Sequence, residues 1–93
     1  MLKVIKNMFI TFFVKIYFLK KLTPENLAKL DKKSIIEKTP KSSFCFINYF
    51  GYRFVGHYIY EDRRTVATLY LEDKHKIKKL STKRKYYFNH KSL

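Results

Sequence analysis

Residues 74–87, KHKIKKLSTKRKYY, alternate cations with hydroxyl and aromatic side chains. The cations and the hydroxyl groups of Ser81 and Thr82 can bind phosphate oxygens. The rings of Tyr86 and Tyr87 can stack on bases, and proteins hold RNA mainly by backbone contacts and by such stacking. The mixture therefore favours RNA binding over a basic tail that only keeps the chain soluble.

The sequence holds no group of residues with the types and spacing of a catalytic or metal site. Its carboxylates come as adjacent pairs at residues 61–62 and 72–73, where expected turns favour polar side chains. His57 lies within an expected strand and is interpreted as structural, and Cys45 as a small core residue. A single cysteine excludes an internal disulfide and, with scattered histidines, disfavours a zinc site. We expect no enzymatic activity, cofactor, metal or small-molecule substrate.

Charge is the most unusual property of this 93-residue chain, in which 21 Lys and Arg face seven Asp and Glu for a net charge of +14. Residues 1–24 and 74–93 contain no acid, whereas residues 25–73 are nearly neutral. Such a charge indicates a polyanionic partner, either nucleic acid or an anionic membrane. We expect one small domain at residues 1–80, with a basic N-terminal arm, and a basic C-terminal tail at residues 81–93.

The most apolar segment is residues 8–19, MFITFFVKIYFL. It is shorter than the roughly 20 apolar residues that span a bilayer, and Lys15 interrupts it. Wound as a helix, it gathers its apolar side chains opposite Lys15 and Thr11. These apolar residues are Phe9, Phe12, Phe13, Ile16 and Leu19, and Ile5 lies on the same side just before the segment. We favour a core helix that packs on a sheet through this side, with a helix lying on a membrane surface and an uncleaved import signal as alternatives.

The remaining elements follow from turn residues and periodicity. Thr23, followed by proline and an acid, predicts the start of a short helix. Residues 32–43 are interpreted as a polar connection. Alternation predicts strands at residues 44–50, 52–60 and 65–71, of which the first is apolar on both sides, as in a well-covered strand. The expected fold is α+β, with one or two N-terminal helices packed on a small antiparallel sheet of about three strands and an extended basic C-terminal tail.

Short motifs also follow one another in a particular order. KNMFI at residues 6–10 opens the first expected helix, and a basic connection then leads to a strand that reaches His57. KHKIKKL at residues 74–80 is followed by Lys and Arg at residues 83–84. This order, with the length and charge, resembles the universal ribosomal protein nineteen of the small subunit, in its bacterial and organellar form. That family has Lys-Gly-Pro-Phe-Val/Ile at the first motif and Gly-His-Lys-Leu-Gly-Glu-Phe, then Thr-Arg, at the last.

The resemblance implies a structural protein in the head of the small ribosomal subunit. It would bind the ribosomal RNA of that subunit, contact neighbouring head proteins, and extend its C-terminal tail toward the tRNA-binding region and tRNA. Divergence from the family and a composition typical of an A+T-rich genome favour a mitochondrial ribosome, in the matrix, over another organellar or a bacterial one. The residues expected to contact RNA are Lys3, Lys6, Lys32, Lys33, Lys41, Arg53, His75, Lys76, Lys78, Lys83, Arg84 and Lys85.

A different class of function also fits the sequence. In this alternative the chain is an accessory subunit of a mitochondrial membrane respiratory complex, anchored by residues 8–19. A second alternative is a free cationic effector, such as a small nucleic-acid-binding regulator or a membrane-active peptide. We expect a membrane partner only in these alternative interpretations.

Overall fold

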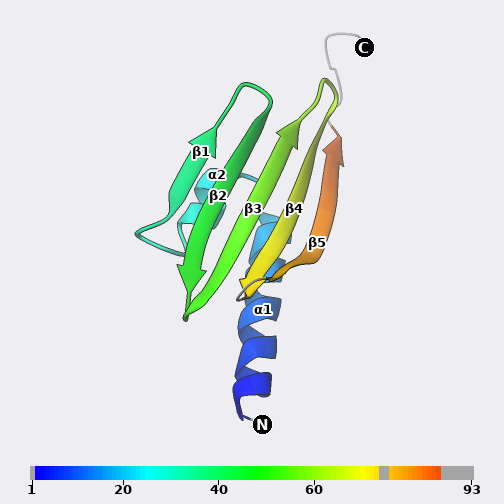
Figure 1. Ribbon diagram of the computed structural model, residues 1–93. Coiled ribbons are helices and arrows are strands. Elements are labelled where there is room, and N and C mark those ends of the chain that lie inside the picture. Colours follow the sequence, from blue (N-terminus) through cyan, green and yellow to red (C-terminus); the bar gives the residue numbers. More distant parts are fainter. Residues whose placement is uncertain (1, 74–75, 87–93) are drawn as a thin grey trace.

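The computed structural model describes residues 2–73 and 76–86, with side chains from residue 8 onward. In chain order the elements are α1 (Leu2–Lys20), α2 (Pro24–Ala28), β1 (Ile35–Lys38), β2 (Ser42–Tyr49), β3 (Tyr52–Tyr60), β4 (Arg64–Asp73) and β5 (Lys76–Tyr86). Consecutive strands pair antiparallel, giving one five-stranded sheet of order β1-β2-β3-β4-β5. Both helices lie on the same face of this sheet (Figure 1), and within the described residues no element covers the other face.

The α+β class is confirmed, as is the hairpin that β3 and β4 form, but the sheet has five strands and not about three. One additional strand, β1, arises within residues predicted to be a connection. The other, β5, includes residues 81–86, which were predicted to lie in the C-terminal tail. Lysine is a poor strand former, so local sequence gave little sign of β5. Pairing along nearly the whole of β4 supplies the backbone hydrogen bonds that stabilise it.

The short helix α2 begins as the sequence predicts. The side-chain oxygen of Thr23 accepts a hydrogen bond from the backbone N–H of Asn26 at 3.2 Å, and Pro24 occupies the first turn. Leu27 points into the core and is fully buried. Thr23 thus fixes the position at which the chain turns from α1 to cover β1 and β2.

The core lies between α1, α2 and the sheet. Three residues of α1, spaced four apart, are buried against the strands: Ile10, Val14 and Phe18. The ring of Phe18 lies 5.8 Å from that of Tyr58 on β3. Gly56 lets α2 pack closely on β3, because any larger residue would place its Cβ only 2.7 Å from Leu27 Cδ2, which is a steric clash.

The prediction of which side of α1 packs on the sheet was wrong. Phe9 is 70% exposed and Phe12 61% exposed, and both lie on the side expected to be buried. Large apolar residues surround most of the helix, so periodicity alone could not show which side faces the sheet. As a result, α1 has one apolar side in the core and another on the surface.

A bulge in β5 reverses the direction in which its side chains point. Tyr70 pairs with Lys79, whereas the neighbouring Leu69 pairs with Ser81, so Leu80 is an additional residue. Before the bulge, the odd-numbered side chains of β5 point to the sheet face that neither α1 nor α2 covers. After the bulge, the even-numbered side chains point to that face.

Candidate nucleic-acid interface

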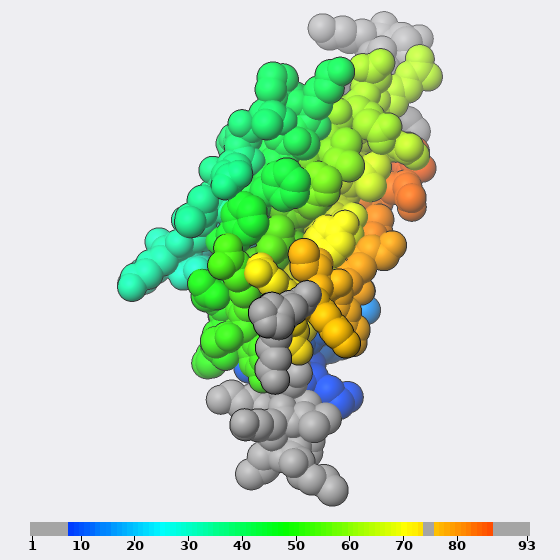
Figure 2. Space-filling view, in the orientation of Figure 1, coloured from blue at the N-terminus to red at the C-terminus, as the bar shows by residue number. Residues whose placement is uncertain are grey.

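The basic residues predicted near the end of the chain form an edge strand of the sheet. Six exposed cations occupy the eleven residues of β5, and no acid occurs among them. They are Lys76, Lys78, Lys79, Lys83, Arg84 and Lys85. Figure 2 shows β5, in orange, along one border of the molecule. Lysines on an edge strand also prevent pairing with another chain, so these residues serve solubility as well as any binding.

The second half of β5 borders an open groove of about 340 Å³, with the end of α1 on the other side. Seven residues line the groove, four of them cations and none of them acidic. They are Leu19, Lys20, Leu22, Lys83, Arg84, Lys85 and Tyr86. Lys83 Nζ donates a hydrogen bond to the carbonyl oxygen of Leu19 at 3.4 Å.

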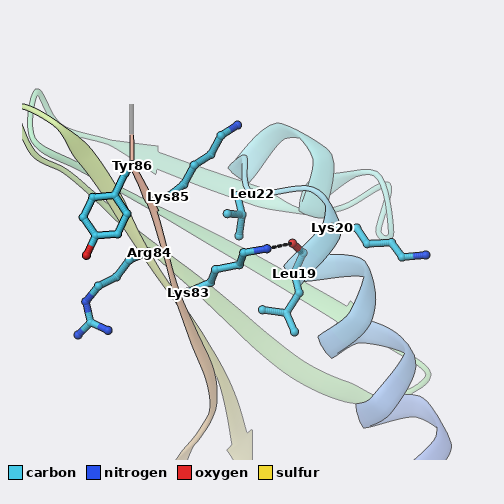
Figure 3. A pocket seen from close by; sticks show the side chains of 7 residues that line it. All are labelled: Leu19, Lys20, Leu22, Lys83, Arg84, Lys85 and Tyr86. Carbon is cyan, nitrogen blue, oxygen red and sulfur yellow. Dashed lines mark hydrogen bonds between the residues drawn. The ribbon is translucent and has the colours of Figure 1, made fainter. Parts of the chain in front are cut away.

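The cations around this groove do not converge on a single point. In Figure 3 the side chains of Lys20 and Lys85 point away from one another, and that of Arg84 leaves from the opposite side of the strand. A compact site for one small anion needs several donors directed at the same point. Charge spread along a strand instead fits an extended polyanion, whose phosphates are spaced along a chain.

Other predicted residues lie far from β5 in the sheet. Lys32 and Lys33 are in the loop after α2, where the Asp31 carboxylate accepts hydrogen bonds from the backbone N–H groups of Lys33, at 3.0 Å, and Asn48, at 2.8 Å. These two bonds lower the pKa of Asp31. Lys41 precedes β2, beside the other edge strand, β1. The structure therefore gathers the predicted cations of β5 but keeps these three apart from them.

Three predicted contacts cannot be placed. Lys3 and Lys6 belong to the first turns of α1, where side chains lie outside the described residues. His75 lies outside the described residues altogether, as do Tyr87 and the rest of the expected tail.

The sheet face without helices, here called the open face, carries aromatic rings that the sequence analysis did not assign to a site. Residues that pair across antiparallel strands point to the same side, which puts Phe44 of β2 beside His57 of β3. Their rings stack at 4.2 Å between centroids, with 3° between planes. Phe46 continues this cluster, 6.2 Å from Phe44 and nearly parallel to it. All three side chains are partly exposed, and Figure 2 looks onto this face.

Successive cross-strand rows connect these rings to the cations of β5. One row runs from Phe46 through Val55 and Tyr70 to Lys79. Arg84, placed on the open face by the bulge, ends another row, and Tyr86, 60% exposed, follows on the same side. The open face thus has rings at its centre and two cations, Lys79 and Arg84, at the β5 edge, whereas the other four cations of β5 point to the helix side.

Arg53 is the predicted cation nearest the ring cluster. Its guanidinium carbon lies 5.6 Å from the centroid of the Phe46 ring. The Nε atom is 3.2 Å from a carboxylate oxygen of Glu72, its direct cross-strand partner. This exposed ion pair keeps the Arg53 guanidinium near the Phe46 ring. The negative charge of Glu72 offsets part of the positive potential that Arg53 offers to a ligand.

Burial sets the protonation states of the two groups considered for chemistry. Partial burial lowers the pKa of His57, so its ring is neutral at pH 7 and stacks as an uncharged aromatic. Burial raises the pKa of Cys45 to about 11, and its thiol therefore remains protonated. Neither group has the features of an activated nucleophile or base.

The sequence did contain one indication of the open face. Both alternating sets in residues 44–50 are apolar, which we interpreted as cover on both sides. The partner strand β3 alternates buried Phe54, Gly56 and Tyr58 with partly or fully exposed residues that include Arg53 and His57. That alternation is typical of a sheet with one open face, and it carries over to β2 only once the pairing is known.

Among residues 2–73 and 76–86, no cluster of three or more His, Cys, Asp or Glu residues is placed to hold a metal ion. Neither of the described helices is long and apolar enough to cross a membrane. Comparison of the chain with protein-family models, with curated proteins and with solved structures gives no match. The resemblance to ribosomal protein nineteen therefore stays a prediction.

Proposed function

We propose that this protein binds RNA, with unpaired bases on the open face of the sheet and the sugar-phosphate backbone along β5. The observation that carries the proposal is the continuity between the ring cluster and the edge cations, seen in the row from Phe46 to Lys79. Bases stack on aromatic rings while cations bind the phosphates between them. One surface thus offers both contacts that a single strand of RNA requires.

The composition of the open face supports a bound partner. Open faces of antiparallel sheets are usually polar, since water covers them. Here Phe44, Phe46 and Tyr70 lie on that face, and the neighbouring Ile77 is 70% exposed. Against an apolar protein partner on this face, Lys79 and Arg84 of β5 would lose hydration without gaining counter-charges. RNA satisfies both the rings and the cations.

Within this class, we propose that the protein is a structural component of the small ribosomal subunit. In this role it binds ribosomal RNA in the subunit head, contacts neighbouring head proteins, and supports the tRNA-binding region of a mitochondrial ribosome. The order of the motifs and the net charge of +14 support this specific role. Of the three residues where the resemblance to the family is tightest, Lys76 and Arg84 are exposed on β5, and His75 lies outside the described residues.

A titration with fluorescently labelled single-stranded RNA tests binding at the open face. The Phe46→Ala variant is expected to weaken binding by about 5- to 150-fold, because stacking on one ring contributes about 1–3 kcal/mol. Increasing salt should weaken wild-type binding in proportion to the number of phosphates neutralised. Phe9→Ala is the matched control, since this exposed ring lies on α1, across the sheet. Equal affinity of the wild type and Phe46→Ala would contradict the proposal.

Sedimentation of ribosomal particles tests the specific role. The tagged wild-type chain is expected to sediment with small subunits in a sucrose gradient and to co-purify with stoichiometric ribosomal RNA. Reversing the charge of Lys83, Arg84 and Lys85 to Glu should release the chain to the top of the gradient, because three phosphate contacts become repulsive. Lys29→Glu, an exposed charge reversal outside β5, serves as the control. A wild-type chain that binds RNA but never sediments with ribosomes would refute the ribosomal assignment alone.

A further inference from the structure

The surface of α1 that faces away from the sheet is apolar and exposed. Met8, Phe9, Phe12 and Phe13 are 66%, 70%, 61% and 48% exposed, respectively. A helix on the surface of a globular protein normally has one apolar stripe, and in α1 the stripe that includes Phe18 already fills the core. The second apolar side therefore indicates a second partner.

Aromatic contacts extend this surface onto the β2–β3 turn. The Phe13 ring stacks on that of Tyr49 at 5.7 Å, and Tyr49 contacts Phe50 edge-to-face at 4.7 Å. Phe50 is 65% exposed. Met8, Phe9, Phe12, Phe13 and Phe50 are together called the α1 patch below.

Phe50 sits in a backbone conformation that disfavours it. Its φ is 51°, and it is followed by Gly51 with φ 84°, so both residues of this two-residue turn have positive φ. Asn-Gly is the usual pair in such a turn, because a large side chain is strained in the left-handed region. The Phe50 side chain is not buried in the core, so no core packing offsets the strain of its backbone. Strain held at an exposed position points to a role in binding.

Cations border the patch on two sides. Lys15 lies seven residues after Met8 and Lys20 seven residues after Phe13, and this spacing places each lysine in line with one edge of the patch. No carboxylate occurs among residues 1–24. The surface thus combines apolar rings with a positive border.

We propose that the α1 patch docks the protein on an anionic lipid surface, with the rings among the acyl chains and Lys15 and Lys20 at the headgroups. Interfacial helices bind membranes through this combination of apolar area and positive charge. The five patch residues carry no hydrogen-bonding side chain, which suits lipid better than a specific protein surface. Figure 1 shows α1 extending beyond the end of the sheet, where a flat surface can approach it.

A second copy of the chain fits the patch less well. Each copy carries a net charge of +14, so self-association brings like charges together, whereas anionic lipid neutralises them. The α1 patch and the ring cluster of the open face lie on opposite sides of the sheet, although Lys20 lines the same groove as Lys83 and Lys85 of β5. Both partners can therefore bind at once, and either proposal can fail without the other.

Co-sedimentation of the full chain with vesicles tests the proposal. The wild type is expected to bind vesicles of phosphatidylcholine mixed with phosphatidylglycerol, and to bind phosphatidylcholine vesicles much more weakly. The double variant Phe9→Ser, Phe12→Ser should lower affinity for the anionic vesicles at least about tenfold, since two exposed rings no longer enter the acyl region. Ile77→Ser is the control, because Ile77 is equally exposed but lies on β5.

Phe50→Asn provides a variant whose folding and binding should change in opposite directions. Asparagine tolerates positive φ, so the melting temperature should rise, while vesicle affinity should fall severalfold because one ring is lost. A melting temperature that rises without loss of vesicle affinity would remove Phe50 from the site.

Four results would overturn the lipid assignment as a whole. These are no binding of the wild type to anionic vesicles, equal binding to neutral ones, full binding by the double variant, and a wild-type dimer in sedimentation equilibrium that the double variant dissociates. RNA titrations of the Phe9→Ser, Phe12→Ser double variant and of Phe50→Asn are expected to match the wild type. A loss of RNA affinity instead would assign the patch to RNA.

Discussion

The two faces of the sheet use the same strands for different purposes. On the helix-covered face, Cys45, Phe54 and Tyr58 are fully buried and pack against α1 and α2. On the open face, Phe44 and His57 stack on each other and remain partly exposed. Both faces are rich in large apolar or aromatic side chains, but only one is covered within the described residues. We infer that the covered face provides most of the stability and that the open face is kept for a ligand.

The largest expected effect is on stability, and it is measured by replacing one phenylalanine on each face with alanine. Phe54→Ala should lower the free energy of unfolding by about 3–5 kcal/mol, because it leaves a cavity in the core. Phe46→Ala, on the open face, should lower it by only about 1 kcal/mol, the size of a cross-strand ring contact. Urea unfolding followed by circular dichroism measures both values.

RNA titrations sharpen the same pair. Phe46→Ala is expected to lose RNA affinity while remaining folded, whereas any loss in Phe54→Ala should follow the fraction of unfolded protein. Equal losses of stability in the two variants would show that the open face is part of the core and would end the distinction.

The smallest expected effect concerns pH and His57. Its pKa is lowered in the folded protein by burial, relative to about 6.5 in an unfolded chain. Well above pH 6.5, His57 is neutral in both the folded and the unfolded chain. Below it, the unfolded state takes up the proton first, so the free energy of unfolding falls with decreasing pH until the pH passes the lowered pKa of the folded state.

Unfolding of the wild type and of His57→Gln at several pH values measures this contribution. The difference between the two proteins is expected to change below about pH 6.5 and to be constant above it. Carboxylates titrate in both proteins and cancel in the difference. A difference that does not depend on pH would place His57 in full contact with water.

Local chemistry was enough to predict some elements of the fold. Thr23 begins α2 through its own hydroxyl group, and the polar residues 61–63 separate the two strands of the central hairpin. These features depend on neighbours in the sequence, which explains why they were found. By contrast, β5 forms because β4 offers a free edge, and its lysine-rich sequence gives little indication of a strand; β1 pairs with the free edge of β2 and has only Ile35 and Ile36 as a local strand signal.

The candidate site was predicted only in part, for the same reason. Charge alone identified the cations of β5, because an acid-free run is visible in the sequence. The stack of Phe44 on His57 joins residues 13 positions apart, and it follows from the register of β2 and β3. Similarly, only the sheet order shows that Lys41 lies near the opposite edge from Arg84.

The bulge at Leu80 lets β5 change length without a change of register, although Leu80 itself packs against the core. Lys79 and Ser81 pair with adjacent residues of β4, so removing Leu80 would join two halves that already alternate correctly. Arg84 would still face the rings, and Lys83 would still face α1. A one-residue deletion elsewhere in a regular strand turns every later side chain to the wrong face. A variant of this chain that lacks Leu80 can therefore keep the same surface.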